Sequence, residues 1–300
     1  MNISNSLFNQ NLIPHSKIDF VNTTVSRDTR LFIDPVLIEI GQSDFCKKAK
    51  SISADFFNQL YSAYYTTNDE TKKKYLLSHA QEINDSHLGY AHRYGHGNTE
   101  DGLFEIFKGI DDYIASIRIS RLFELALYVP NFAEDGMSDL LTNVLYETLS
   151  DFTIEQCKKF NLQTTTCTKD RYYWDHKKHC WGKYTGESLV VDGKIILLIP
   201  KEIVQTHYRF TCDNFLRSVI VENLCEQQAS YDSKGKKSRP PKDKVREKIV
   251  KENGTVAATA KSFAGKDSSL LKQYQKIIDE KYQTLQLSDD ELDYRVYDNS

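Results

Sequence analysis

The stretch "SLVVDGKIILLIPKEIV", residues 188–204, places an Asp-Gly pair between two apolar runs that are rich in β-branched side chains. β-Branched residues favour strands, and Asp-Gly between two such runs is typical of a tight hairpin turn. This is the clearest strand pattern in the chain, whereas the longer patterns around it repeat at helical spacing. We therefore expect an α+β fold, a helix-rich body with a small β-sheet that includes this hairpin.

Several segments before the hairpin carry patterns that can be assigned. "RLFIDPVLIEI" (residues 30–40) is predicted to be a short strand that runs into a turn or helix start, because proline lacks a ladder donor and disfavours helix just before it. Asp34 is then expected at the end of an element. Residues 43–82 have apolar side chains at three- and four-residue spacing on both sides of "TTNDET", which predicts two helices. The same spacing over residues 103–128 predicts another helix with a core-facing stripe.

"NFAEDGMSDLLTNVLYETLSDFT", residues 131–153, contains the most informative polar side chains. Ser138 is a suitable N-cap for a helix that we expect to run to about Phe160. Polar residues at four-residue spacing share one helix face, and a hard cation such as Mg²⁺ binds carboxylate and amide oxygens. The stretch therefore suggests a magnesium site whose ligands are Asp135, Asp139 and Asn143.

Two earlier aspartates, Asp28 and Asp34, are candidates to join Asp139 and Asn143 as catalytic residues. Helix physics is the competing explanation, because a capping serine and a first-turn carboxylate complement the helix dipole without any metal. That explanation covers Ser138 and Asp139. It does not cover Asn143, a mediocre helix former at a half-buried position, so we expect its amide to be hydrogen-bonded to a specific partner.

Residues 87–103, "HLGYAHRYGHGNTEDGL", are predicted to form a loop because they contain four glycines. Glycine lets a backbone approach a phosphate closely, and histidine or arginine can neutralise or protonate one. The candidates for phosphate contact are His92, Arg93 and His96. A plain surface loop is the alternative, since no named phosphate-loop pattern is present.

"CTKDRYYWDHKKHCW", residues 167–181, combines zinc-type ligands with aromatic residues. The zinc-type ligands are Cys167, His176, His179 and Cys180, but their spacing is not that of a standard finger. Arg171 and His176 have the R-x4-H spacing that resembles the HEPN family of metal-independent ribonucleases. Packing of the aromatic side chains in the core is the default explanation for the stretch.

The C-terminal part of the chain is basic. Residues 234–251 hold nine Lys or Arg against two acidic residues, a net charge of +7, so the rest of the chain carries −10 of the total of −3. We expect a main domain over residues 1–228 and a basic linker with a helical region over 229–300. Within residues 245–280 the order of helices and turns resembles a helix-turn-helix unit. Lys/Arg clusters bind phosphates, and the candidates are Lys234, Lys236, Lys237 and Arg239.

The remaining composition favours a cytoplasmic protein. No apolar run reaches the roughly 18 residues that span a bilayer, and the first 20 residues lack the pattern of a secretory signal. The six cysteines are scattered without a C-x-x-C pair, so we expect reduced thiols. A membrane partner is not expected.

Four stretches occur in an order that resembles an uncharacterised bacterial family: "SRDTRLFIDP", "HLGYAHRYGHGN", "EDGMSDLLTNVLYETLSDFT" and "ILLIPKEIV". That family has a G-x-D-x-[IM]-S-D-x-x-x-N motif and an [IL]-L-[IV]-P-K strand, and its members belong to mobile-element or phage-defence loci. Here Ala133-Glu134 stand where a glycine is usual. The resemblance implies that Asp28, Asp34, Asp139 and Asn143 are important, without assigning their chemistry.

These observations favour a nucleic-acid-acting component of a bacterial anti-phage defence or mobile-element system. The expected form is a metal-dependent nuclease that uses Mg²⁺, with other proteins of the same locus as further partners. The alternative is a non-catalytic DNA-binding, sensor or protein-interaction component that uses the C-terminal helices. The sequence leaves both open, as it does the choice between DNA and RNA.

Overall fold

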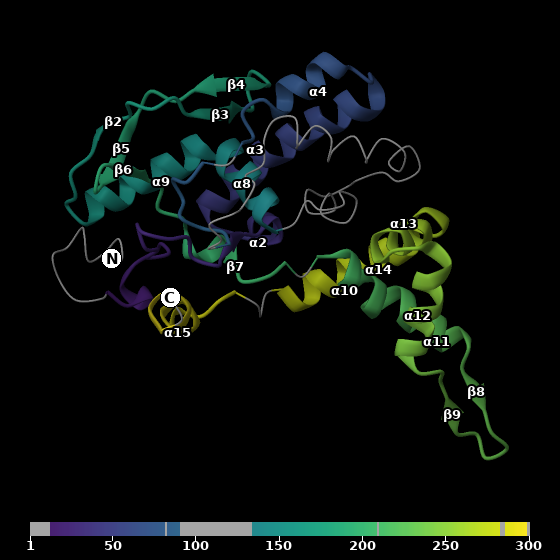
Figure 1. Ribbon diagram of the computed structural model, residues 1–300. Helices are drawn as coiled ribbons and strands as arrows, with labels where there is room; N and C mark the ends of the chain where they lie inside the picture. The colour runs from purple at the N-terminus through teal and green to yellow at the C-terminus, as the bar shows by residue number, and fades with distance from the viewer. Residues whose placement is uncertain (1–12, 82, 91–133, 209, 283–285, 299–300) are drawn as a thin grey trace. The chain divides into compact units, whose positions relative to one another are not determined.

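The computed structural model describes residues 13–81, 83–90, 134–208, 210–282 and 286–298 (Figure 1). The chain divides into two compact units, which are described separately. Unit 1 consists of residues 1–105, 132–208 and 285–300, and unit 2 of residues 106–131 and 209–284. Helices dominate and the strands form small antiparallel sheets, so the expected α+β fold is confirmed.

The hairpin predicted from the opening stretch is present in unit 1. β5 (Glu187–Val191) pairs with β6 (Lys194–Ile196), and β2 (Thr165–Thr166) pairs with the other edge of β5. The two turn residues have positive φ, 50° at Asp192 and 76° at Gly193, as a type I′ turn requires. The apolar side chains of the hairpin and of the residues after it join a core cluster that includes Phe20, Cys157, Leu189, Val191, Ile196 and Leu198.

The prediction for the Asp-Pro stretch is also confirmed. β1 (Phe32–Ile33) pairs with β7 (Val204–Gln205), and α2 (Pro35–Ile40) follows directly. Asp34 is the N-cap of α2, since its Oδ1 accepts the Val36 N–H at 2.8 Å. Proline at the first helical position needs no donor there, which explains the abrupt change from strand to helix.

The two helices expected between residues 43 and 82 are α3 (Asp44–Tyr61) and α4 (Glu70–Leu77). A π-helical turn, η2 (Ser62–Thr66), extends α3 before the polar break. Side-chain caps start both helices: Ser43 accepts from the third residue of α3 and Asp69 from the third residue of α4.

The two tryptophans of the 167–181 stretch pack in the core as expected, whereas Tyr172 and Tyr173 are half-buried. β3 (Tyr172–Asp175) and β4 (Cys180–Lys183) form a hairpin in which Trp174 lies opposite Trp181. The two indole rings meet edge to face with centroids 5.6 Å apart. Both indole N–H groups donate to acceptors of unit 1, the Asp55 carboxylate at 2.7 Å and the Leu76 carbonyl at 3.1 Å.

The helix expected from Ser138 to about Phe160 consists of two helices, α8 (Glu134–Val144) and α9 (Tyr146–Lys159). The prediction that Ser138 caps it is wrong, because α8 already begins at Glu134. The Ser138 hydroxyl instead accepts the Ile33 N–H at 3.0 Å, so it ties β1 to α8. That acceptor role depends on a strand far away in the sequence.

The described part of unit 2, residues 210–282, is helical apart from one small hairpin. Its described elements are α10 (Cys212–Phe215), η5 (Leu216–Ile220), α11 (Val221–Gln227), β8 (Ser230–Tyr231), β9 (Lys237–Ser238), α12 (Lys242–Asn253), α13 (Val256–Lys266) and α14 (Ser268–Tyr282). Thus unit 2 includes the short helices before residue 228 as well as the basic region after it.

The last three helices of unit 2 follow one another through tight turns, in the order predicted for a helix-turn-helix-like region. Gly254, with φ of 91°, ends α12, and the Thr255 hydroxyl caps α13. At the start of α14 the Asp267 carboxylate accepts the Ser269 N–H at 2.9 Å. The aromatic rings of Phe210 and Phe215 stack on Tyr274 of α14.

The chain returns to unit 1 at its end. α15 (Asp289–Asp293) and η6 (Tyr294–Asp298) lie against η1 (His15–Lys17), near the short η4 (Lys201–Ile203). The helix expected over residues 103–128 lies outside the described residues. Within the described parts of the chain, no helix has both the length and the apolar character needed to cross a bilayer.

Candidate functional site

The site is built around a glycine turn of unit 1. In residues 86–90, His87 O accepts the Thr29 N–H at 2.9 Å, and the Gly89 N–H donates to Thr29 O at 3.0 Å. Gly89 has φ of 136°, and a Cβ added there would lie 2.7 Å from Oδ1 of Asp135. Position 89 therefore requires glycine. This close approach places the start of α8 against the turn.

Five carboxylates gather beside this turn, and we call them the acidic cluster: Asp28, Asp34, Glu134, Asp135 and Asp139. All except Asp28 lie close enough to Tyr208 for their charges to raise the pKa of its hydroxyl. The charge of Asp28 acts in the same way on Asp135. The aspartates of the 28–34 stretch and those of α8 thus lie in one region, although more than 90 residues separate them in the sequence.

Tyr208 is the buried centre of this region. Its hydroxyl donates to Ile33 O at 2.5 Å and lies 3.1 Å from Glu134 O, so it links β1 to α8. Burial raises the pKa of Tyr208 well above its usual value of 10, and the charge of Asp34 is the next cause. The phenol therefore stays neutral and donates its proton to the backbone.

Glu134 is held by two donors. Its Oε1 accepts the Tyr208 N–H at 2.9 Å, and its Oε2 accepts the Tyr90 hydroxyl at 2.6 Å. Burial and the bond to Glu134 raise the pKa of Tyr90 to about 12. The guanidinium of Arg30 lies over the Tyr90 ring, 5.3 Å from its centroid. Glu134 therefore acts as a structural acceptor within the cluster.

Asp135 differs from Glu134 because its ionised form is destabilised. Burial raises its pKa, the Tyr90 N–H opposes that effect, and the charges of Asp28 and Glu134 raise it further. The side chain is half-buried and faces like charges. Its ionised form is therefore destabilised, which a bound cation would reverse.

His87 lies next to Asp28. Its Nδ1 is 3.8 Å from Asp28 Oδ1, and its backbone has a positive φ of 51°, which is uncommon for a residue other than glycine. The ring is 4% exposed, and its Nε2 has no hydrogen-bond partner among the described residues. Buried polar atoms are nearly always bonded, so this nitrogen is unusual.

The other predicted ligands have structural contacts. Asp34 is buried and caps α2. The Asn143 amide donates to Gln81 O at 2.6 Å and to Asp139 O at 3.1 Å, so the expected specific partner is present. Asn143 thereby ties the segment after α4 to α8, and Asp139 is buried beside it.

Among the described residues, no group of three or more His, Cys, Asp or Glu is placed to hold a metal ion. This holds for the acidic cluster and for the zinc-type residues of the 167–181 stretch. The expected phosphate contacts His92, Arg93 and His96 lie outside the described residues.

The 167–181 stretch has other structural contacts. Arg171 forms two hydrogen bonds with the buried Asp85 carboxylate, at 2.6 and 2.7 Å, and the Tyr146 hydroxyl donates to the same group. The His179 ring lies 2.8 Å from Asp55. These contacts give Arg171 and His179 structural roles in unit 1.

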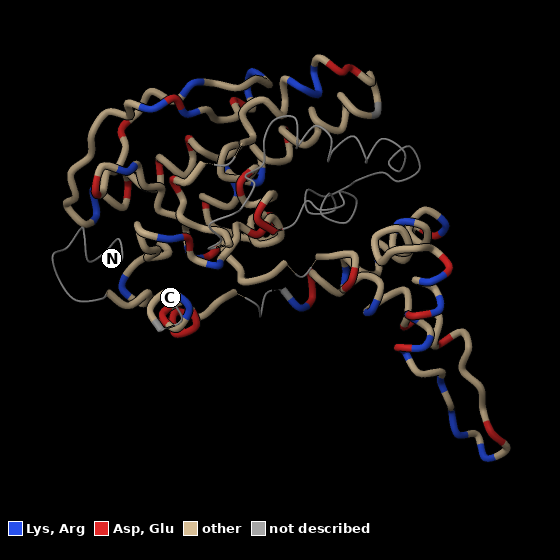
Figure 2. Tube along the Cα trace, viewed as in Figure 1, with Lys and Arg blue, Asp and Glu red and all other residues tan. Residues whose placement is uncertain are grey.

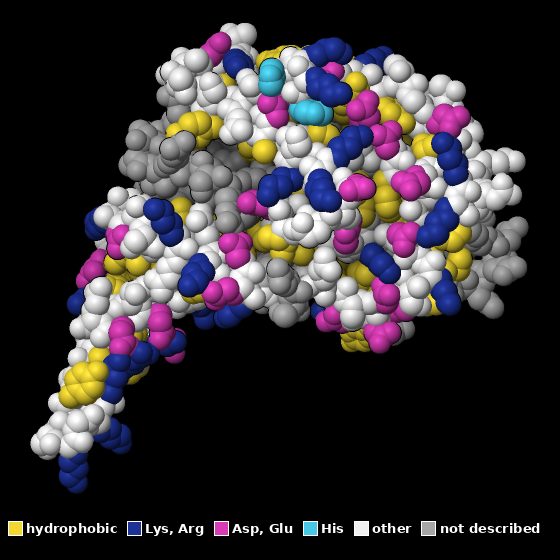
Figure 3. Space-filling model, turned by 180° about the vertical axis from the view of Figure 1, so that it is seen from behind, with side chains coloured by type: hydrophobic (Ala, Val, Ile, Leu, Met, Phe, Trp, Pro, Cys, Tyr) yellow, Lys and Arg dark blue, Asp and Glu magenta, His cyan; other side chains and the backbone are white. Residues whose placement is uncertain are grey.

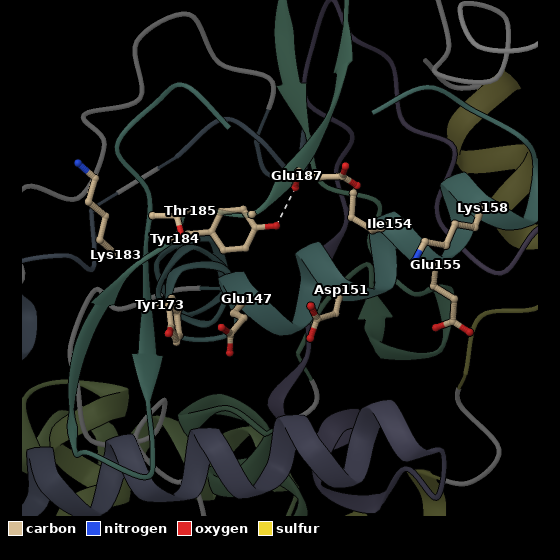
Figure 4. Close-up of a pocket in the computed structure, with 11 residues that line it drawn as sticks. Glu147, Asp151, Ile154, Glu155, Lys158, Tyr173, Lys183, Tyr184, Thr185 and Glu187 are labelled. Carbon is tan, nitrogen blue, oxygen red and sulfur yellow. Dashed lines mark hydrogen bonds between the residues drawn. The ribbon is translucent and has the colours of Figure 1, made fainter. Parts of the chain in front are cut away.

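A second region of unit 1 is an open polar groove of about 510 Å³ between α9 and the segment that joins β4 to β5 (Figure 4). Acidic side chains of α9, including Glu147 and Asp151, line one side, and Tyr184 and Glu187 line the other. The Tyr184 hydroxyl donates to Glu187 O at 2.7 Å.

The predictions from sequence did not include four residues of the main site: His87, Tyr90, Glu134 and Tyr208. Two signals were available in the chain. His87 directly precedes a Leu-Gly pair, and Glu134 directly precedes Asp135. For Tyr208 no local pattern exists, because its role depends on contacts with β1 and α8.

Fold and site together define an α+β protein with a half-buried acidic cluster beside a glycine turn. The chain belongs to the family described as a domain of unknown function (DUF8370), whose family model matches residues 12–211. No curated protein and no solved structure matches the chain. Any statement about activity must therefore come from the chemistry of the site.

Proposed function

We propose that this protein is a magnesium-dependent nuclease of a bacterial phage-defence or mobile-element system, which acts on nucleic acid in the cytoplasm. The observation that carries the proposal is the acidic cluster, in which carboxylates from two distant segments share one partly buried region. Like charges in such a place repel one another and disfavour folding, and a bound cation offsets that cost. A carboxyl group whose pKa is raised by burial and by neighbouring carboxylates, as at Asp135, is typical of catalytic sites.

Asp28 and Asp135 are the best candidates to hold the ion. Asp34 and Glu134 accept hydrogen bonds from the protein, and Asp139 is buried beside Tyr208 and Asn143. Mg²⁺ commonly uses only one or two carboxylates, with water and substrate phosphate as its other ligands. Two carboxylates therefore suffice.

A magnesium ion at this place would stabilise the negative charge that develops on a phosphodiester during hydrolysis. The protein's own contribution is to hold Asp135 between the glycine turn and α8 and to keep Tyr208 neutral behind it. Arg30, exposed over the Tyr90 ring, provides a positive charge for the substrate phosphate.

The test combines metal binding with cleavage. Mg²⁺ or Mn²⁺ is expected to raise the melting temperature of the wild-type chain and to support cleavage of DNA or RNA, and EDTA is expected to abolish both effects. Asp28→Asn and Asp135→Asn should each lower cleavage at least about 100-fold and remove the metal-dependent shift. Asp44→Asn, at a fully exposed position in α3, is the matched control and should change neither.

If Asp135→Asn loses cleavage but its melting temperature still rises with Mg²⁺ or Mn²⁺, then Asp135 is not a ligand of the metal. Cleavage that persists in EDTA would refute the metal-dependent mechanism altogether.

The second candidate function is non-catalytic DNA binding by unit 2. The observation that favours it is the succession of α12, α13 and α14 through tight turns, with a basic first helix. It predicts binding of the full chain to DNA with a steep salt dependence and no cleavage with any divalent metal. Retained binding in Asp28→Asn together with absent cleavage in the wild type would favour it over the nuclease.

A further inference from the structure

A basic arm extends from unit 2 between α11 and α12 (Figures 1 and 2). We define it as residues 228–241, in which β8 and β9 pair with Ser230 opposite Ser238. Residues 230–239 are all exposed, and Tyr231 keeps 66% of its surface accessible. A two-stranded ribbon without a core is marginally stable by itself. Contacts at its base must therefore fix its direction.

The base of the arm is fixed to α11 by ion pairs. Arg239 pairs with Glu222 at 2.8 Å and also with Glu226, and Lys237 pairs with Glu226. Lys242, at the start of α12, adds a contact to Glu222 at 2.5 Å. Lys242 and Arg239 lower the pKa of Glu222, so its carboxylate stays ionised. The positive charges of Lys237 and Arg239 are thus largely compensated.

The tip of the arm differs from its base. Asp232 Oδ1 accepts the backbone N–H groups of Lys234 and Lys236, each at 2.9 Å, and Gly235 has φ of 74°. Among the described residues, neither lysine side chain forms an ion pair with a carboxylate. Figure 3 shows Lys and Arg side chains projecting at this end. The turn is therefore ordered by its backbone, and its two ammonium groups point to solvent.

We infer that this arm binds the phosphate backbone of double-stranded nucleic acid, with Lys234 and Lys236 in contact with phosphates and Lys237 and Arg239 holding the arm in position. The four basic residues predicted as phosphate contacts then divide into two contacting and two positioning residues. This inference rests on the proposed function only in that both take nucleic acid as the ligand.

A duplex fits this arm better than a single strand does. A two-stranded β-ribbon has the dimensions of the major groove of B-DNA, and lysine binds phosphate as a compact point charge. Sites for single strands use several aromatic side chains on which successive bases stack. The arm exposes one large aromatic residue, Tyr231. An arm fixed at its base also loses less conformational freedom on binding.

The test measures binding of the full chain to a fluorescent 20-base-pair duplex in EDTA, so that cleavage cannot interfere. Lys234→Gln/Lys236→Gln is expected to weaken binding by about tenfold or more at 0.1 M salt, and to reduce the slope of log K against log salt by about 1.8. Lys47→Gln/Lys48→Gln, two exposed lysines of α3 in unit 1, is the matched control and should leave the slope unchanged.

Arg239→Gln separates positioning from contact. If Arg239 only positions the arm, the variant binds more weakly while its salt slope stays within about 0.3 of the wild-type value. A slope lowered by about 0.9 would show that Arg239 itself releases a counterion, and would overturn the division of roles.

The whole inference fails if the double lysine variant keeps the wild-type affinity and slope, or if a single-stranded 20-mer binds more tightly than the duplex. These outcomes are independent of the nuclease proposal. If the double lysine variant binds as the wild type does, the arm inference fails, but cleavage that needs Asp135 can still be observed. If the wild type does not cleave nucleic acid, the nuclease proposal fails, but binding by the arm in EDTA can still be observed.

Discussion

Ser138 shows how one hydroxyl can join two elements that are distant in the sequence. It is 4% exposed and lies inside α8, where its oxygen accepts the Ile33 N–H of β1. A buried backbone N–H without an acceptor costs about 1–3 kcal/mol. We therefore expect Ser138→Ala to lower the free energy of unfolding by that amount, measured by urea denaturation.

Ser78→Ala is the matched control for Ser138→Ala. Its hydroxyl is exposed and donates to Tyr75 O just after α4, so the change should stay within about 0.5 kcal/mol. Equal effects of the two substitutions would contradict the role of Ser138. From the sequence, Ser138 was predicted to be a helix N-cap, which is the commonest role of serine near a helix start. The actual partner lies 105 residues away, and no local pattern encodes such a distance.

At the scale of elements, the stability of α2 distinguishes two roles for Asp34, a helix cap or a catalytic group. Asparagine caps helices about as well as aspartate, whereas alanine loses about 0.5–2 kcal/mol. We expect Asp34→Ala to be destabilised by that amount and Asp34→Asn by clearly less, as measured by thermal unfolding. Asp34→Asn should also keep any nuclease activity that Asp135→Asn loses. Loss of that activity in a stable Asp34→Asn variant would make Asp34 part of the chemistry.

The elements that the sequence predicted are those with local causes. The Asp-Gly pair specifies the β5–β6 turn through positive φ at Asp192 and Gly193, and Asp34-Pro35 specifies the start of α2. The start of α8 was predicted at Asp139, five residues after Glu134, because Ser138 satisfied the rule for a cap. The pairing of β1 with β7 joins segments about 170 residues apart in the chain, and such pairings depend on tertiary packing rather than local propensity.

The same distinction applies to the site. The sequence predicted a magnesium site in α8 because Asp135, Asp139 and Asn143 recur there at four-residue spacing. That site stays a prediction. The sequence could not show which side chains of α8 make structural hydrogen bonds and which one has a destabilised ionised form. Asn143 binds backbone, Glu134 accepts from two tyrosines, and only the geometry distinguishes them from Asp135.

On the scale of the whole chain, the first and last described segments contact each other within unit 1: the His15 N–H donates to Asp293, and the Tyr297 hydroxyl donates to Ile13 O (Figure 1). His15 is fully buried, and its Nδ1 lies 2.6 Å from Asp293 Oδ1 of α15. Lys201 binds Asp289 at 2.6 Å, and Leu292 of α15 is completely buried. The sequence grouped this final segment with the basic region after residue 229. Its burial against the N-terminal segment is a tertiary contact. The composition of the final segment therefore does not indicate it.

The contact between His15 and the last described segment predicts a pH dependence of stability. Burial lowers the pKa of His15 below its usual 6.5, more than the opposing bond to Asp293 raises it, and Lys201 lowers it further while Asp289 raises it. The unfolded chain therefore binds a proton at His15 more readily than the folded chain does. The stabilisation is fully present above about pH 6.5 and is lost as the pH falls, with a slope of at most about 1.4 kcal/mol per pH unit.

His15→Gln isolates this effect, because glutamine does not titrate and every other histidine is unchanged. We expect the free energy of unfolding of the wild type to fall more steeply between pH 7.5 and 5.5 than that of the variant, as measured by urea denaturation at each pH. Asp289, Asp293 and Lys201, the charged groups that act on His15, are the same in the wild type and the variant, so the difference in slope belongs to the imidazole. A wild type that becomes more stable relative to the variant toward pH 5.5 would mean that His15 is protonated in the folded chain and that its bond to Asp293 is an ion pair. Equal slopes would mean that folding leaves the pKa of His15 unchanged, which also contradicts the prediction.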